Sequence, residues 1–170
     1  MVRMPLAPLP ADVEEVLRNR GAAQVNLYRA LANAPAISRA WLGFLWALRD
    51  DCDTPRSLRE LLILRTAVRH ASAYEWHHHE AMALQAGLSP EKVAAVPSWQ
   101  DFPGFDPAER AALSLTDAIC DGDVREEIWQ EATRWFEPGE LVELVVTAAA
   151  YVMVPRVLDA LAVPVEPSSG

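Results

Sequence analysis

Apolar residues recur every three to four positions along almost the whole chain, and this spacing constrains the fold more than any other feature. The period is that of an amphipathic α-helix with one buried face. The alternating apolar and polar pattern that predicts a β-strand is found nowhere in the sequence. Because there is also no low-complexity linker, the sequence predicts a single all-α domain over residues 1–170.

Capping residues, proline and glycine mark where the helices begin and end. The Thr54-Pro55 pair predicts a helix start with Thr54 as N-cap, and Ser72 is expected to cap the following helix, which Gly87 ends. The other expected helices cover residues 11–20, 24–33, 35–50, 90–96, 107–120, 125–136 and 138–163, with one loop of note at 97–105.

The chain is acidic, which argues against some classes of partner. The 170 residues carry a net charge of −9, with a pI of about 4.9. Such a protein repels a phosphate backbone, so we expect no nucleic-acid partner. The longest apolar stretch, residues 141–155, is interrupted by Glu143 and is shorter than the roughly 20 residues that span a bilayer. We therefore expect no membrane partner.

Two features predict a cytoplasmic location. The N-terminus has no apolar segment of the kind found in secretory signals. Only two cysteines occur, Cys52 and Cys120, and they do not form a CxxC pair. This usage is typical of a reducing compartment.

One segment concentrates reactive side chains within otherwise apolar helices. It brings the carboxylates of Glu60 and Glu75 close in sequence to the side chains of Ser72, Tyr74 and His77 to His79. Buried polar groups cost free energy unless they are paired, so such a cluster indicates a site. Glu75 and His79 are four residues apart and share a helix face, where a carboxylate can orient an imidazole for general acid–base catalysis.

Each of these side chains also has a structural explanation. Glu–His pairs four residues apart are common on helix surfaces, and Glu60 could stabilise the helix dipole from a first turn. The consecutive imidazoles lie about 100° apart around a helix, so His77 or His78 is expected to be solvated or at an interface. A metal site formed by Glu60, Glu75 and His79 is a further alternative, although the chain has no HExxH motif.

The spacing of this segment resembles the carboxymuconolactone decarboxylase / alkylhydroperoxidase D (AhpD-like) superfamily. Its peroxidases carry a Glu, a Cys twelve residues on, and then x-x-Cys-x-x-x-His. Here the same frame falls on Glu60, Ser72, Glu75 and His79. Residues 74–79 (YEWHHH) and 151–161 (YVMVPRVLDAL) look like the branch of the family that lacks the cysteines. The resemblance covers about residues 30–163, where it implies the core of an AhpD-like helical bundle.

The departures from the peroxidase pattern affect the expected chemistry. Both thiol positions hold other residues, Ser72 and Glu75, and a hydroxyl and a carboxylate cannot form a disulfide. Cys52 and Cys120 lie outside the frame. The family's route to peroxide reduction needs a thiolate nucleophile and a resolving thiol. We therefore do not expect thiol peroxidase activity.

The resemblance to the cysteine-free decarboxylases implies acid–base chemistry without a cofactor. We expect a decarboxylase, lyase or isomerase that acts on a small carboxylic acid or lactone. His79 would be the acid. Glu75 would orient its imidazole, and Glu60 would exchange protons with it as a relay. The expected substrate-binding residues are Ser72, Tyr74 and Arg156, the arginine because its guanidinium can hold a carboxylate; Arg65 and Arg69 are further candidates.

Two alternatives to this enzyme stay open. In one, the protein is a non-catalytic or small-ligand-binding family member and the cluster is a structural polar network. In the other, the protein is a metal-dependent enzyme whose metal is held by Glu60, Glu75 and His79. The family forms trimers or hexamers, which implies a homo-oligomer, and the apolar fraction of 51% is consistent with a buried subunit interface.

Overall fold

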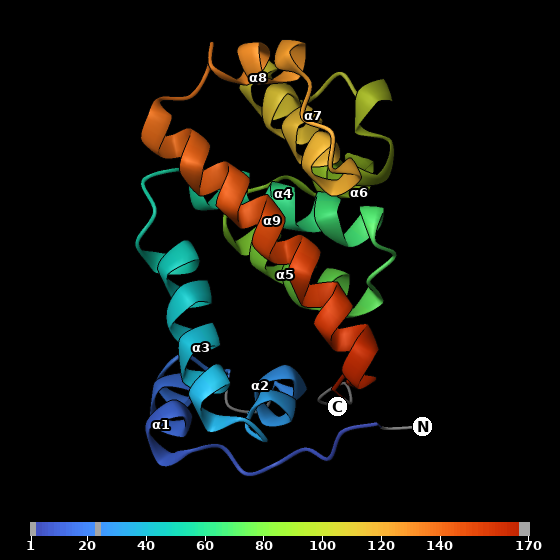
Figure 1. Ribbon diagram of the computed structural model, residues 1–170. Coiled ribbons are helices and arrows are strands. Elements are labelled where there is room, and N and C mark those ends of the chain that lie inside the picture. The colour runs from blue at the N-terminus through green and yellow to red at the C-terminus, as the bar shows by residue number, and fades with distance from the viewer. Residues whose placement is uncertain (1–2, 23–24, 167–170) are drawn as a thin grey trace. The chain divides into compact units, whose positions relative to one another are not determined.

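The computed structural model describes residues 3–22 and 25–166, and the regular structure of these residues is entirely helical (Figure 1). This confirms the all-α class. Residue 24, the first residue of one expected helix, lies outside the described residues. The elements are α1 (Ala11–Asn19), α2 (Asn26–Leu31), α3 (Pro35–Asp50), α4 (Arg56–Arg69), α5 (Ala73–Gln85), α6 (Pro90–Ala95), the 3₁₀-helix η1 (Val96–Asp101), α7 (Pro107–Asp121), α8 (Glu126–Ala132) and α9 (Pro138–Leu161).

Most helices begin and end within a few residues of the predicted positions, but two segments differ. Residues 97–105, predicted as a loop, form 3₁₀ turns as far as Asp101 with a kink at Ser98, and Val96 and Trp99, three residues apart, are both buried there. Helix α8 ends at Ala132 rather than near residue 136. Beyond it, the backbone N–H groups of Arg134 and Trp135 bond to carbonyls three residues back instead of four.

The described residues group into two compact units. One contains the residues up to Asp50 together with those from Arg156 onward, and the other is Asp51–Pro155. The boundary falls within α9. The single domain predicted over residues 1–170 stays a prediction.

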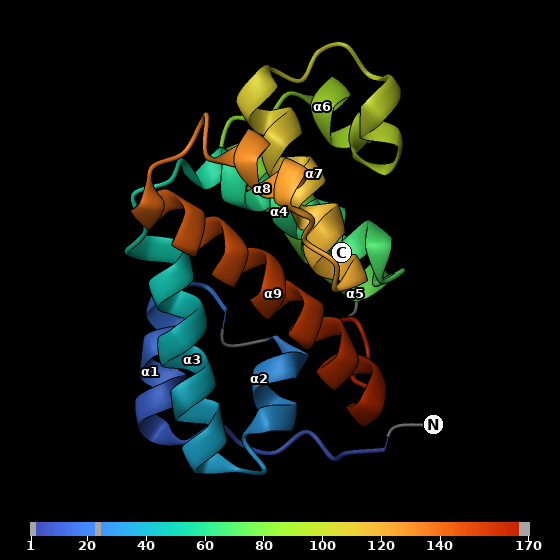
Figure 2. The same cartoon turned by 45° about the horizontal axis from the view of Figure 1, so that its top comes forward.

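Helix α4 forms the centre of the second unit. Leu61, Leu62 and Leu64 are buried in its core, and α4 packs against α5 and α7 (Figure 2). Burying each of these leucine side chains stabilises the fold by about 1.5–3 kcal/mol. The position of α4 is therefore fixed from both sides. This packing also fixes the positions of the polar side chains that α4 carries.

The start of α4 differs from the prediction. The N-cap is Pro55, with no side-chain cap, so the expected cap role of Thr54 is wrong. The Thr54 hydroxyl instead accepts a hydrogen bond from Arg59, at 3.2 Å. The carboxylate of Glu143, on α9, accepts the backbone N–H groups of Asp53 and Thr54, each at 2.8 Å. A side chain distant in sequence thus holds the segment that leads into α4.

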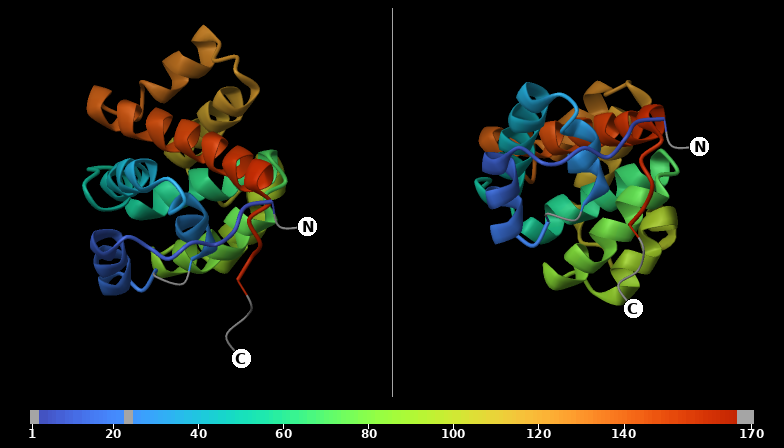
Figure 3. Two further views of the ribbon diagram at one scale, coloured as in Figure 1. Left: turned by 60° about the horizontal axis from the view of Figure 1, so that its bottom comes forward. Right: turned by 90° about the horizontal axis from the view of Figure 1, so that it is seen from below.

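In the first unit, α1 and α2 both pack against α3 (Figures 2 and 3). Leu17 of α1, Tyr28 of α2 and Leu45 of α3 are buried in this packing. All three helices therefore place their apolar stripes inward, as their periodicity predicts.

Helix α9 is the one helix among the described residues that is long and apolar enough to cross a membrane. It has 24 residues, and its most apolar window has a mean hydropathy of 1.8. Half of that window is buried within the protein, as in the central helix of many globular folds. The absence of a membrane partner stays a prediction.

Replacing Glu143 with Gln should make stability less dependent on pH. Burial, the largest single effect, tends to raise the pKa of Glu143, but hydrogen bonds from Thr54 and Asp53 together outweigh it and leave the pKa below its usual value. A lowered pKa stabilises the folded state above the unfolded pKa, and this contribution is lost as pH falls through the folded value. We expect Glu143→Gln to cost about 1 kcal/mol at neutral pH and progressively less in acid.

Urea unfolding at about pH 7 and about pH 3.5 measures this difference. Glu137→Gln is the control, because Glu137 is an exposed carboxylate just before the same helix. An equal loss of stability for Glu143→Gln at both pH values would contradict the prediction.

Candidate active site

The fold brings Glu60 of α4 together with Glu75 and His79 of α5. The two helices pack along each other because both direct apolar residues into the core of the second unit. The three polar side chains are almost fully enclosed: Glu60 is 0% exposed, His79 2% and Glu75 4%. Burying such groups costs several kcal/mol each unless they are paired. Their stability therefore depends on the contacts that they make.

His79 lies between the two carboxylates, one at each ring nitrogen. Its Nδ1 is 2.7 Å from Oε2 of Glu60. When Glu60 is ionised it can only accept hydrogen bonds, so in that state Nδ1 carries the proton and donates it to Glu60. Nε2 is 3.6 Å from Oε2 of Glu75, which is longer than a hydrogen bond but within ion-pair range. The ring thus presents Nε2 as the nitrogen that can take up or release a proton.

Arg56 is the cationic side chain that contacts the Glu60 carboxylate. Its Nη2 donates to Oε1 of Glu60 from one turn earlier in α4, so the carboxylate is shared between a guanidinium and an imidazole. Since α4 begins at Arg56, Glu60 lies beyond the first turn, and that turn has no acidic residue. The alternative explanation of Glu60, a first-turn interaction with the helix dipole, therefore does not apply. Arg56 is not among the residues that the sequence frame indicates, although its i,i+4 spacing to Glu60 is a signal for the pair.

Tyr151 of α9 is a second contact that the site prediction does not include. Its ring meets the His79 imidazole edge to face, with centroids 5.0 Å apart and an interplanar angle of 88°. Tyr151 is itself buried. A buried aromatic wall of this kind restricts the rotation of the imidazole. In the sequence, Tyr151 belongs only to the family-like C-terminal stretch, and nothing local connects it to His79.

The expected substrate-binding residues lie in three different settings. Ser72 is the N-cap of α5, as predicted, and its Oγ accepts the N–H of Glu75 at 3.3 Å. Tyr74 is buried and packs against His78, with ring centroids 4.7 Å apart. Arg156 is exposed and belongs to the first unit. Substrate binding by these residues stays a prediction.

The arrangement around His79 does not suit a single metal ion. The described residues contain no group of three or more His, Cys, Asp or Glu side chains placed to hold one. Glu60 and Glu75 lie against opposite nitrogens of one ring, whereas metal ligands must converge on a common point. The residues present therefore fit proton transfer better than the metal-binding alternative.

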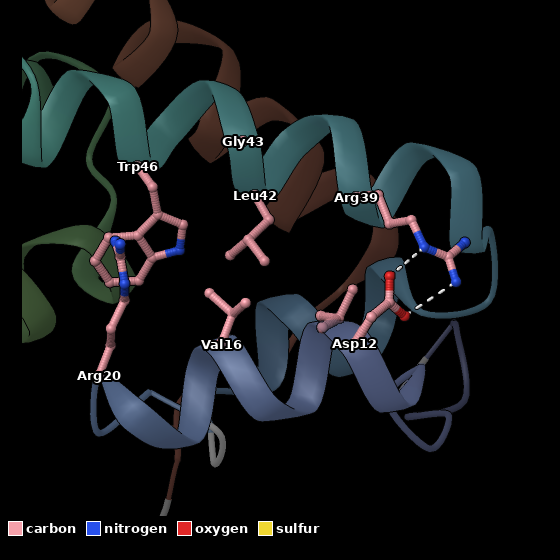
Figure 4. A pocket seen from close by; sticks show the side chains of 8 residues that line it. Asp12, Val16, Arg20, Arg39, Leu42, Gly43 and Trp46 are labelled. Atoms are coloured by element: carbon pink, nitrogen blue, oxygen red, sulfur yellow. Dashed lines mark hydrogen bonds and ion pairs between the residues drawn. The ribbon is translucent and has the colours of Figure 1, made fainter.

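A groove of about 400 Å³ lies between α1 and α3 of the first unit (Figure 4). Arg39 at one end donates two hydrogen bonds to Asp12, at 2.6 and 3.0 Å. Arg20 at the other end stacks 4.2 Å from the ring centroid of Trp46 and pairs with Asp50. Both arginines are thus already engaged. The lining residues are Asp12, Val13, Val16, Arg20, Arg39, Leu42, Gly43 and Trp46.

A recess of about 470 Å³ lies beside α7 in the second unit. In its wall, Asp117 accepts two hydrogen bonds from Arg65, at 2.6 and 2.9 Å, and Asp121 pairs with Arg69. The arginines considered as carboxylate binders therefore join α4 to α7. The carboxylates of Asp117 and Asp121 are likewise used in holding α4 to α7.

Comparison with known families gives one match in sequence. Residues 35–118, which include the whole Glu60 to His79 segment, match the model of the carboxymuconolactone decarboxylase family. No curated protein matches the chain.

Several solved structures share the fold at low sequence identity. An uncharacterized peroxidase-related protein from Silicibacter sp. has a TM-score of 0.84 at 17% identity, over 96% of this chain and 90% of that one. An uncharacterized peroxidase-related protein from Ralstonia eutropha, described as an alkylhydroperoxidase AhpD core, has a TM-score of 0.82 at 19% identity, over 96% and 92% of the two chains. Debrominase Bmp8, in a variant bound to 2,3,4-tribromopyrrole, has a TM-score of 0.81 at 20% identity, over 95% and 91%.

These findings agree with the resemblance seen in the sequence. The structural likeness extends over nearly the whole chain and shows the fold, while the sequence match covers the segment that carries the Glu60, Ser72, Glu75 and His79 frame. Residues 35–118 thus match the carboxymuconolactone decarboxylase family, and the described helices adopt the AhpD-like fold.

Proposed function

We propose that this protein is a cofactor-free acid–base enzyme, of decarboxylase, lyase or isomerase type, that acts on a small carboxylic acid or lactone. The observation that carries the proposal is the buried set of Glu60, His79 and Glu75, in which one carboxylate holds Nδ1 and the other faces Nε2. General acid–base catalysis requires an oriented imidazole with one nitrogen left to exchange protons. The geometry meets both requirements.

The proposed reaction needs a donor that can protonate carbon. Loss of carbon dioxide from a lactone acid breaks the bond between the ring carbon and its carboxylate, and the electron pair moves into the lactone enolate. His79, which for this step carries a proton on Nε2 as well as on Nδ1, then donates the Nε2 proton to that carbon, while Glu60 holds the ring through Nδ1–H. Solvent returns the proton to Nε2. A positioned imidazole contributes roughly 10²–10⁴-fold to such a step.

The relatives support a small ring compound as substrate. The matched family takes its name from a lactone decarboxylase, and one structural neighbour is a debrominase bound to a brominated pyrrole, also a small ring. The thiol chemistry of the peroxidases would need cysteines where this chain has Ser72 and Glu75. Acid–base chemistry makes use of the residues that are present.

We expect His79→Gln to lower kcat/KM by about 10²–10⁴-fold. The assay presents a panel of unsaturated γ-lactone carboxylic acids in D₂O and follows both carbon dioxide release and deuterium incorporation at carbon by NMR. The matched control is His77→Gln, because His77 is two residues away on the same helix but exposed. Equal activity of the two variants would refute the role of His79, and a wild-type protein inactive on the whole panel would count against this substrate class.

A second candidate function has an observation in its favour. Because Glu60, Glu75 and His79 are almost fully buried, they could form a polar network that specifies how α4 packs on α5 in a non-catalytic or ligand-binding protein. In that case, the triad contributes to stability, and no member of the substrate panel is turned over.

Glu60→Ala should destabilise the protein by about 3 kcal/mol, because it removes the buried carboxylate that contacts Nδ1 of His79 and Nη2 of Arg56. Chemical denaturation measures the loss. Glu80→Ala is the control, since Glu80 is an exposed carboxylate on α5 and should change stability by no more than about 0.5 kcal/mol. Similar costs for the two variants would show that the triad does not stabilise the packing of α4 on α5.

We also propose a cytoplasmic homo-oligomer, with no nucleic-acid or membrane partner. The net charge of −9 supports the exclusion of nucleic acid, and exposed apolar side chains such as Ile37 and Val142 support subunit contacts. Light scattering after size exclusion should give a mass of three or six times 18.8 kDa. A monomer would contradict this proposal.

A further inference from the structure

Arg56 occupies a position in α4 that is unfavourable on local grounds. It is the first residue of the helix, and the first turn contains no acidic residue. The N-terminal end of a helix carries a partial positive charge, which repels a cation and attracts an anion. Residues that contradict the local preferences of a helix are often found at functional positions. The contact that offsets this placement is the one between Arg56 and Glu60.

Four side chains that start at Arg56 contact one another in sequence. The guanidinium contacts Oε1 of Glu60, the other oxygen of Glu60 accepts from Nδ1 of His79, and Nε2 of His79 faces Glu75. The Arg56 side chain is 31% exposed, whereas that of Glu60 is fully buried. Arg56 therefore keeps part of its hydration while its charge acts on the buried carboxylate.

The ionisation state of Glu60 determines which nitrogen of His79 carries the proton. An ionised Glu60 can only accept, which keeps the hydrogen on Nδ1. A buried carboxyl group without a cation tends to become protonated, and its O–H can then donate to Nδ1. That change would move the imidazole proton to Nε2 and leave no basic nitrogen facing Glu75.

We propose that Arg56 is the positioning residue of this site: by holding Glu60 ionised through Oε1, it keeps the His79 proton on Nδ1 and leaves Nε2 as the nitrogen that exchanges protons. The inference rests on the acid–base function proposed above. It concerns a property of the free protein, however, so it can be tested without a substrate.

The test is long-range ¹H–¹⁵N NMR of protein labelled with ¹⁵N-histidine, at a pH where the imidazoles are neutral. The chain has four histidines, and His79→Gln identifies the signals of His79. We expect wild-type His79 to be mainly in the Nδ1–H form. In Arg56→Gln, the ratio of the Nδ1–H to the Nε2–H form should fall about tenfold, whereas Arg56→Lys should retain part of it because the charge remains.

Arg69→Gln is the matched control. Arg69 lies on the same helix, has a side chain that is 33% exposed and also pairs with a carboxylate, that of Asp121. This variant should leave the His79 signals unchanged. Urea unfolding of each variant establishes that the spectra report folded protein.

An unchanged tautomer ratio in Arg56→Gln, or an equal change in Arg69→Gln, would overturn the proposal. A folded Arg56→Lys protein with the wild-type ratio, beside a shifted Arg56→Gln, would support control by charge. If the tautomer ratio of His79 falls in Arg56→Gln but the wild-type protein turns over no substrate, the positioning role is upheld and the acid–base function is refuted. The two proposals can therefore fail separately.

Discussion

The shared carboxylate of Glu60 is the group on which the rest of the site depends. Its side chain is fully buried, and its two oxygens accept from Arg56 on one side and from His79 on the other. Removing a carboxylate from water is costly, and only donors at both oxygens offset that cost. The Glu60–His79 contact joins α4 to α5, and Arg56 binds the same carboxylate from within α4. Under the proposed function, stability and reactivity both depend on this one group.

Helix α4 can position Glu60 because it is held along its whole length. Glu143 binds the backbone just before it, its leucines fill the core, and Arg65 and Arg69 tie its later turns to Asp117 and Asp121. A proton-transfer site tolerates errors of only a fraction of an ångström. Much of what surrounds the site therefore maintains its geometry without taking part in chemistry.

The sequence predicts those features that depend on local spacing. Helical periodicity indicates the all-α fold, Ser72 is recognisable as a cap, and the frame of Glu60, Glu75 and His79 indicates that they meet. The structure adds what tertiary contacts decide. Thr54 fails as a cap because its hydroxyl bonds to Arg59 and a carboxylate from α9 binds the backbone there. Tyr151 reaches His79 through packing alone, which no local pattern encodes.

The two positions that hold thiols in the peroxidases show how one scaffold can carry different chemistry. Ser72 accepts the N–H of Glu75 as a helix cap, a bond that a thiol makes only weakly. Glu75 places a carboxylate opposite Nε2 of His79. A carboxylate can exchange protons with that nitrogen but cannot attack peroxide and form a disulfide as a thiolate does. Because Glu60 contacts the other side of the His79 ring, a carboxylate at residue 75 gives the site proton-transfer chemistry under the proposed function.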